Sequence, residues 1–321
     1  MGQADLPTLS VVIVTYGRAT FLERCLRSLH GEGADISQLV VVDASPEPSQ
    51  ELAENAYTGL LYLHAPELAG HMTRARNRAL LHVEGDVIAY LDDDVVVHPG
   101  WARAVRLGFH EEAIDALVGR TLNGQTGEED PTQPIGTLER DGRLTAGFAA
   151  AAPGRLTVAH GIGANMSFTR EALRRLGGFR DDYPGTALRE DTDIFLRIQR
   201  LGGVAMFDPA AVVDHLPAPH VRGRRFDTRY KLYGRRNHIV LLARHGGLAS
   251  AQLRRWMQGQ LADVMRVPGV RRKIERFGVT TLGLVWGVAA AFRQAGLRPL
   301  APERSGVDAS SIRASLQDPV H

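Results

Sequence analysis

The sequence lacks the features of several protein classes. Its single cysteine, Cys25, excludes an internal disulfide and a cysteine zinc cluster, and it is typical of a reducing compartment. The longest uncharged run, 277–292, is shorter than the about 20 residues that a membrane-spanning helix needs. No positively charged region followed by a long apolar stretch begins the chain, so we identify no secretory signal. We therefore predict a cytoplasmic protein.

Two nucleotide-binding signatures are also missing. The chain has no G-x-x-x-x-G-K-[ST] loop, which argues against a P-loop NTPase, and no G-x-G-x-x-G follows its first apolar run. What it does have is 321 residues, 44% of them hydrophobic. That is enough for one large α/β domain or two smaller domains with a substantial core.

Positive charge is concentrated in one segment. Residues 222–276 hold 15 Lys or Arg and three Asp or Glu, a net charge of +12, whereas residues 1–221 carry a net charge of −11. A basic segment of this kind indicates an anionic partner, such as a diphosphate, a phospholipid surface or nucleic acid, unless it forms only solvated helix faces. The uncharged run beside it, flanked by Arg276 and Arg293, is either a buried helix or an interfacial one.

The first third of the chain alternates apolar runs with helical patterns. We predict strands at 9–14, 39–42, 60–63 and 86–91 and helices at 19–29 and 73–82. This order favours a mostly parallel sheet with helices on both faces, in which ligands bind at the carboxyl ends of the strands. Polar groups follow three of the predicted strands, at 15–18, Asp43 and 92–94.

After residue 120 we expect a less regular segment, followed by a helical C-terminal region. We predict a loop at 121–134, a strand and a helix within 161–178, a helix at 191–201, a strand at 203–214 broken at Asp208-Pro209, basic helices over 226–276 and a loose tail after 297. The expected divisions are 1–120, 121–221, 222–297 and 298–321.

Four groups could carry chemistry. The first is the triplet Asp92, Asp93 and Asp94, which suits a hard divalent cation such as Mg²⁺. The same pattern is also typical of an acidic turn that binds no metal. Asp191, at a helix start, could be a general base or only a cap. His215 could complete a metal site and favours Mn²⁺, or be structural, and Arg76 could bind phosphate or form a surface ion pair.

Seven motifs in order resemble the family 2 glycosyltransferases of the GT-A fold. They span residues 9–216 and read VVIVTYGR, VVVDAS, RARNRAL, GDVIAYLDDDVVVHPGW, GIGANMSFTREALRRLGGF, REDTDIFLRIQRLGG and VVDHL. The resemblance implies an α/β GT-A domain, a nucleotide-sugar donor and an inverting transfer.

The resemblance also implies roles for individual residues. Asp94 and His215 would bind the metal ion, Mg²⁺ or Mn²⁺, and Asp191 would be the catalytic base. The residues expected to bind the nucleotide sugar are Thr15, Tyr16, Arg18, Asp43, Arg76, Asp92, Asp93 and Asn165. Many members read D-D-G-S where this chain reads Asp43-Ala44-Ser45, which leaves the nucleobase open.

The segment 215–229 contains two prolines, a glycine and four arginines, a composition typical of a loop. We predict a lid in which Arg224 and Arg225 grip the donor diphosphate; a surface loop facing lipid or solvent is the alternative.

The resemblance thus implies a metal-dependent inverting hexosyl- or deoxyhexosyltransferase. Its acceptor would be a hydroxyl of a glycan, a lipid-linked sugar or a small molecule, with peripheral membrane contact through the C-terminal region and no nucleic-acid partner. The alternatives are a nucleotidyltransferase-like or non-catalytic sugar-nucleotide-binding protein.

Overall fold

The computed structural model describes residues 6–185, 187–216, 227–294 and 309–317. The strands are β1 (Leu9–Thr15), β2 (Gln38–Asp43), β3 (Leu61–His64), β4 (Val87–Asp92), β5 (Val95–Val97), β6 (Ala116–Leu122), β7 (Leu156–Thr157), β8 (Asn165–Thr169) and β9 (Ala205–His215). The helices are α1 (Ala19–Ser28), α2 (Gln50–Ala56), α3 (Met72–Ala79), α4 (Trp101–Glu111), α5 (Arg170–Leu176), α6 (Glu190–Arg200), α7 (Thr228–Gly246), α8 (Ala251–Met265), α9 (Val270–Arg293) and α10 (Ala309–Ser315), with short 3-10 turns η1 (His30–Glu32) and η2 (Pro66–Leu68).

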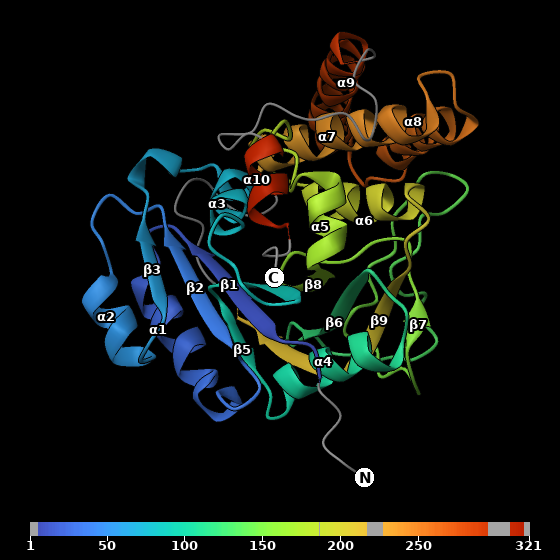
Figure 1. Ribbon diagram of the computed structural model, residues 1–321. Helices are drawn as coiled ribbons and strands as arrows, with labels where there is room; N and C mark the ends of the chain where they lie inside the picture. The colour runs from blue at the N-terminus through green and yellow to red at the C-terminus, as the bar shows by residue number, and fades with distance from the viewer. Residues whose placement is uncertain (1–5, 186, 217–226, 295–308, 318–321) are drawn as a thin grey trace.

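One mixed sheet runs through the body of the molecule in the order β3-β2-β1-β4-β8-β6-β9-β5, and β7 pairs with β9 (Figure 1). The strands β3, β2, β1 and β4 are parallel, as expected from the alternating sequence pattern. Beyond β4 the pairing changes, because β8 is antiparallel to both β4 and β6. The α/β fold class is confirmed, and parallel pairing occurs in the N-terminal half and again between β6 and β9.

Alternation along the strands gives the sheet two buried faces. Val12, Val14 and Tyr90 pack beneath α3, α5 and α6, whereas Val11 and Ile13 pack beneath α1 and α4. Since both faces are covered, the central strands are apolar at almost every position.

Two segments differ from expectation. Asp208-Pro209 does not end a strand: β9 continues past it through a register shift opposite Gly119 and Arg120. The tail expected to be loose contains α10, which packs against α5 and buries Ile312 and Leu316.

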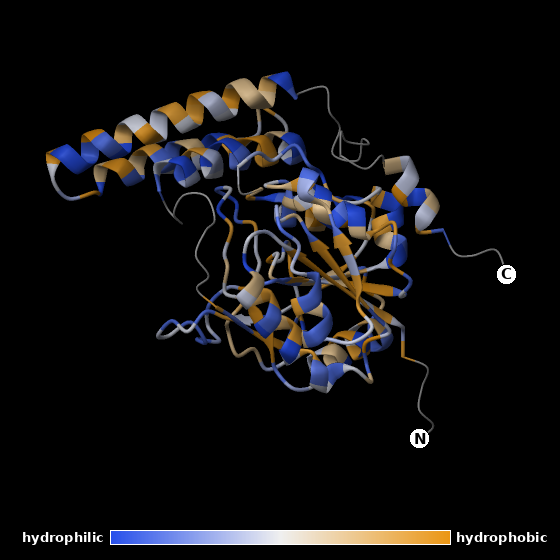
Figure 2. Ribbon diagram, turned by 90° about the vertical axis from the view of Figure 1, so that its left-hand side faces the viewer, coloured by the Kyte–Doolittle hydropathy of each residue, from blue (hydrophilic) through white to orange (hydrophobic). Residues whose placement is uncertain are grey.

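The basic C-terminal region is the helical layer α7–α9 above the body (Figure 1). The helix α9 approaches α7 closely because it presents glycine at the contact, where a Cβ on Gly287 would lie 2.7 Å from Ile239 Cδ1. Figure 2 shows these helices extending beyond the sheet. Among the described residues, none of the helices has the length and apolar character required to cross a membrane.

Candidate active site

The polar residues predicted at strand ends meet at one edge of the sheet. Thr15 is the register partner of Asp43 across β1 and β2, and Val14 is the partner of Asp92 across β1 and β4. The parallel arrangement therefore brings the three strand ends side by side, and the turn from β4 to β5 adds Asp93 and Asp94.

Asp93 lies beneath this edge and positions its neighbours. Its carboxylate is fully buried, accepts a hydrogen bond from Thr15 Oγ1 at 2.6 Å and pairs with Arg18 at 2.5 Å. Burial raises the pKa of Asp93 to about 7, although Arg18 opposes the rise. This carboxylate orients Thr15 and Arg18, and its contact with the donor stays a prediction.

Asp92, Asp94 and His215 form a group that could hold a metal ion. One ligand atom from each lies within 4.8 Å of the others, while ligands about 2.1 Å from one ion lie about 3–4 Å apart, so small movements suffice. His215 Nε2 is 3.4 Å from Asp94 Oδ1, and Arg18 donates to Asp94 Oδ2 at 2.8 Å. Burial raises the pKa of Asp94, but His215 and Arg18 outweigh it and the pKa is lowered.

Asn123, at the end of β6, supports this group and was missed in the sequence. Its Oδ1 lies 3.1 Å from His215 Nδ1. With the proton on Nδ1, the Nε2 lone pair is directed to the side of Asp94. Metal-binding histidines usually have such a hydrogen bond at the ring nitrogen that does not bind the metal. The contact therefore fits a divalent cation bound by two carboxylates and an imidazole.

Arg76 joins the metal group to the segment of the expected base. It is 1% exposed, pairs with Glu190 at 2.5 Å and with Asp92 at 3.2 Å, and donates to the Gly163 carbonyl at 3.2 Å. Burial raises the pKa of Glu190 to about 8, with Arg76 acting against the rise. The sequence showed Glu190 only as one acid in an acidic run, and its role depends on a contact with a residue 114 positions away.

Asp191 lies in the first turn of α6, where the backbone is held in an uncommon conformation. Ala187 and Arg189 have φ values of 56° and 87°, the left-handed region that non-glycine residues rarely adopt. Asp191 is half-buried, and its Oδ1 accepts a hydrogen bond from the Thr192 amide at 2.7 Å. No hydrogen bond from the described residues reaches its Oδ2, so that oxygen remains able to accept a proton.

Residues of the C-terminal helices hold this turn in place. Arg189 Nε donates to His238 Nδ1 at 2.9 Å, and His238 Nε2 donates to the Gly142 carbonyl at 2.8 Å. The His238 ring stacks on Trp256 of α8 at 4.4 Å. Burial lowers the pKa of His238 well below its ordinary value, which keeps the ring neutral and able to accept from Arg189.

Asn165 and Asp43, both predicted to bind the nucleotide sugar, make hydrogen bonds within the protein. Asn165 is buried between strands, accepts from Trp101 Nε1 at 3.0 Å and donates to the carbonyls of Arg120 and Ala211. Its amide is engaged within the protein, and its contact with the donor stays a prediction. Asp43 is buried and accepts from the amides of Ser45 and Ser49 and from Tyr62, so it organises the loop after β2.

Tyr16 lies half-buried at the end of β1, beside the edge that carries the carboxylates. Arg222, Arg224 and Arg225 lie outside the described residues, as does most of the proposed lid.

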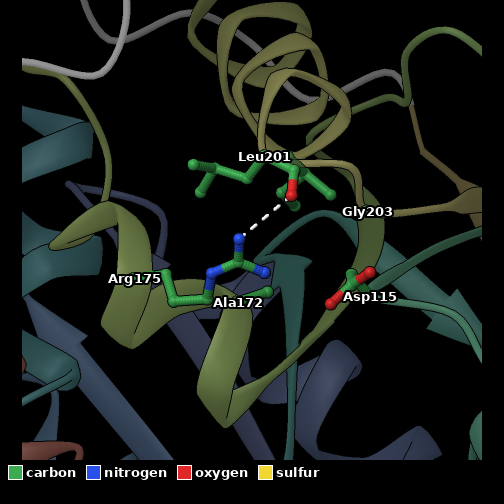
Figure 3. A pocket seen from close by; sticks show the side chains of 6 residues that line it. Asp115, Ala172, Arg175, Leu201 and Gly203 are labelled. Atoms are coloured by element: carbon green, nitrogen blue, oxygen red, sulfur yellow. Dashed lines mark hydrogen bonds between the residues drawn. The ribbon is translucent and has the colours of Figure 1, made fainter.

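A small hollow lies away from this site (Figure 3). Figure 3 shows Asp115, Ala172, Arg175, Leu201 and Gly203 around it, with Arg175 donating to the Leu201 carbonyl at 3.0 Å. Asp115 precedes β6, which runs parallel to β4 because both are antiparallel to β8. The hollow is therefore at the opposite edge of the sheet from Asp92.

Known proteins with related sequences include a glycosyltransferase and a succinoglycan biosynthesis protein. The chain is 29% identical to the pre-mycofactocin glycosyltransferase of Mycobacterium tuberculosis over 210 residues, 64% of this chain and 42% of that protein. It is 27% identical to the succinoglycan biosynthesis protein ExoM of Rhizobium meliloti over 261 residues, 76% of this chain and 81% of that protein. The chain thus spans about two fifths of the first relative's length.

Solved structures share the fold. GalNAc-T7 with UDP, GalNAc and Mn²⁺ matches 94% of this chain and 59% of its own length, with a TM-score of 0.60 and 18% identity. The mannosyltransferase PcManGT from Pyrobaculum calidifontis, in complex with GDP-Man and Mn²⁺, matches 92% of this chain and 88% of its own length, with a TM-score of 0.52 and 17% identity. The family model described as glycosyl transferase family 2 matches residues 10–177, more than half of the chain. With the motifs and the GT-A-type sheet, this match shows that the chain belongs to glycosyltransferase family 2.

Proposed function

We propose that the protein transfers a hexosyl or deoxyhexosyl group from a nucleotide-diphosphate sugar to an acceptor hydroxyl, with inversion and with a divalent cation. The observation that carries the proposal is the Arg76 bridge. Arg76 contacts Asp92 of the metal group and Glu190, the neighbour of Asp191. The proposed metal site and the proposed base therefore belong to one site.

The donor class is supported by the structural neighbours. One neighbour was solved with UDP and GalNAc and the other with GDP-Man, each with Mn²⁺. In this chain the nucleotide would lie at the ends of β1 and β2, against Thr15, Tyr16 and the loop that Asp43 organises, with Arg18 and Arg76 near the diphosphate. A glycan, a lipid-linked sugar or a small molecule is the proposed acceptor, and the cytoplasmic location remains a sequence-based proposal.

The proposed transfer is a single displacement. The acceptor oxygen bonds to the anomeric carbon as the bond from that carbon to the diphosphate oxygen breaks, and the hydroxyl proton passes to Asp191. A bound Mn²⁺ or Mg²⁺ would neutralise the negative charge that develops on the departing diphosphate. Asp92, Asp94 and His215 would hold that ion, and the imidazole favours Mn²⁺.

The test is a donor panel with one matched pair of variants. Wild-type protein should hydrolyse or transfer from one of the UDP-, GDP- or dTDP-sugars only with added cation. Asp191→Asn keeps the shape but cannot take the proton, so turnover should fall by about 10²–10⁴-fold with little change in donor affinity.

Asp263→Asn, at a surface ion pair on α8, is the control and should retain activity. Full turnover of Asp191→Asn would remove the residue from its role, and full activity in EDTA would exclude the cation. NMR of the product anomer decides whether the transfer inverts.

A further inference from the structure

The helix α9 has a buried side and an exposed side, and both are largely apolar. One side is buried within the C-terminal layer and carries Thr280, Gly283, Leu284, Gly287, Ala290 and Ala291. The other is exposed and carries Val270, Ile274, Phe277, Leu282, Val285 and Phe292, each between 54% and 75% exposed. At 3.6 residues per turn the centres of these two sets are about 140° apart, with Phe277 and Leu284 at the border between them. Packing within the protein therefore accounts for only one of the two sets.

The end of α8 also carries exposed hydrophobic side chains. Leu261 and Met265, one turn apart, are 41% and 69% exposed just before the chain turns into α9. We call these eight residues of α8 and α9 the outer patch. Among the described residues, the other exposed large hydrophobic side chains are Leu61, Leu156 and Val204, at separate places on the body. The concentration on α8 and α9 marks an interaction surface.

Basic side chains surround the outer patch. Residues 251–293 hold eight Lys or Arg and two Asp or Glu, a net charge of +6. Arg271, Arg272 and Arg276 are exposed near the start of α9, and Arg293 is exposed at its end. An apolar stripe bordered by arginine combines the two attractions that draw an amphipathic helix to an anionic lipid surface.

We propose that the outer patch docks the protein on an anionic lipid bilayer, with α9 lying in the plane of the interface. From Val270 to Phe292 the stripe is about 33 Å long at 1.5 Å per residue, so the whole helix contributes. No described helix can cross a bilayer, so the contact is peripheral.

A second copy of the chain fits the outer patch less well than a lipid bilayer does. Pairing two outer patches face to face would bring two surfaces of net charge +6 together, and like charges oppose that contact at ordinary salt. The bilayer offers opposite charge instead. The proposal does not depend on the transfer reaction, because lipid binding is measured without donor or acceptor.

Cosedimentation with vesicles tests the proposal on the full chain. Wild-type protein should bind phosphatidylcholine vesicles containing phosphatidylglycerol, and bind pure phosphatidylcholine at least about tenfold more weakly at about 0.1 M salt. The variant Phe277→Glu/Val285→Glu/Phe292→Glu should lose binding. Leu156→Glu, an exposed apolar position on β7, is the matched control and should bind like wild type. Equal binding by the triple variant and the control overturns the proposal.

A label reports insertion directly and avoids substitutions that add charge. Cys25 is buried and is the only natural cysteine, so an environment-sensitive dye can be attached at Phe277→Cys, with Leu156→Cys as control. Emission should shift to the blue at position 277 and not at 156 when phosphatidylglycerol vesicles are added. An unchanged spectrum at 277 overturns the proposal, as does a dimer in analytical ultracentrifugation that the triple Glu variant dissociates.

Discussion

Arg76 has three different acceptors within reach. Its guanidinium contacts Glu190, Asp92 and the Gly163 carbonyl while lying 5.5 Å from the Phe179 ring centre. A planar group with several donors suits such a buried junction. The chemistry of the site therefore depends on one side chain of α3, a helix that contributes no other predicted site residue.

We predict that Arg76→Met lowers the free energy of unfolding by about 3–5 kcal/mol at pH 9, as breaking a buried pair does. The loss should be smaller at pH 6. In the wild type the pKa of Glu190 is raised to about 8, and removing Arg76 raises that pKa further. Above pH 8 folded wild type loses the Glu190 proton, whereas the folded variant retains it, so the variant loses more stability as the pH rises. Urea unfolding at both pH values measures this. Adding Glu190→Gln should abolish the difference between the two pH values, and a loss that does not vary with pH contradicts the assignment.

His215 and Asn123 give a prediction for metal binding. Asn123→Ala leaves the ligands intact but frees the imidazole to rotate, so Mn²⁺ affinity should fall about 10–100-fold. His215→Ala should lose at least as much. Electron paramagnetic resonance of free Mn²⁺, in the presence of nucleoside diphosphate, measures both. Asp214→Asn, on the neighbouring exposed carboxylate that pairs with His98, should bind as wild type.

Much of the site was visible in the sequence because its residues follow apolar strands. Asp92 and Asp94 directly follow β4, and the parallel order places them beside Thr15. The sequence could not show that Asp93 and Asn165 are buried, because their burial involves partners 78 and 64 residues away in the sequence. Glu190, Asn123 and His238 were missed for the same reason, since each contributes through a distant partner.

At the scale of elements, the close contact between α7 and α9 depends on small residues. A Cβ on Gly287 would lie 3.0 Å from Ile239 Cβ and 3.2 Å from Arg236 Cα, which is backbone. Gly278, on the same helix, has nothing within 4 Å of its added Cβ. The sequence pattern showed a long uncharged run at 277–292. It could not show which face of the resulting helix would pack against α7.

These two glycines make a matched pair. Gly287→Val should separate α9 from α7 and lower the melting temperature, because overpacking costs about 1–3 kcal/mol. Gly278→Ala should raise stability by up to about 1 kcal/mol, because alanine favours helix where there is room. Thermal unfolding followed by circular dichroism compares them. A Gly287→Val protein as stable as wild type would mean that the close packing of α9 on α7 is not required.

At the scale of the whole molecule, α7 ties the C-terminal layer to the glycosyltransferase body. His245 donates to Asp193 Oδ1 at 3.0 Å, and Arg244 pairs with Asp182 at 2.5 Å. Together with the bond from Arg189 to His238, these contacts link α7 to the start of α6 and to the segment before it. The helix that starts with the proposed base is thus supported by the layer that carries the outer patch.

This junction should make the protein sensitive to acid. Burial lowers the pKa of both His238 and His245 in the folded chain, while unfolded histidine titrates near 6.5. The unfolded state therefore binds more protons below pH 6.5, so the stabilising contribution is complete above that pH and declines as pH falls towards the folded pKa values. We expect the urea midpoint to drop between pH 7 and pH 5. The double variant His238→Gln/His245→Gln should be less stable at pH 7 but lose much less on acidification. Parallel profiles for the two proteins would show that these histidines do not cause the acid sensitivity.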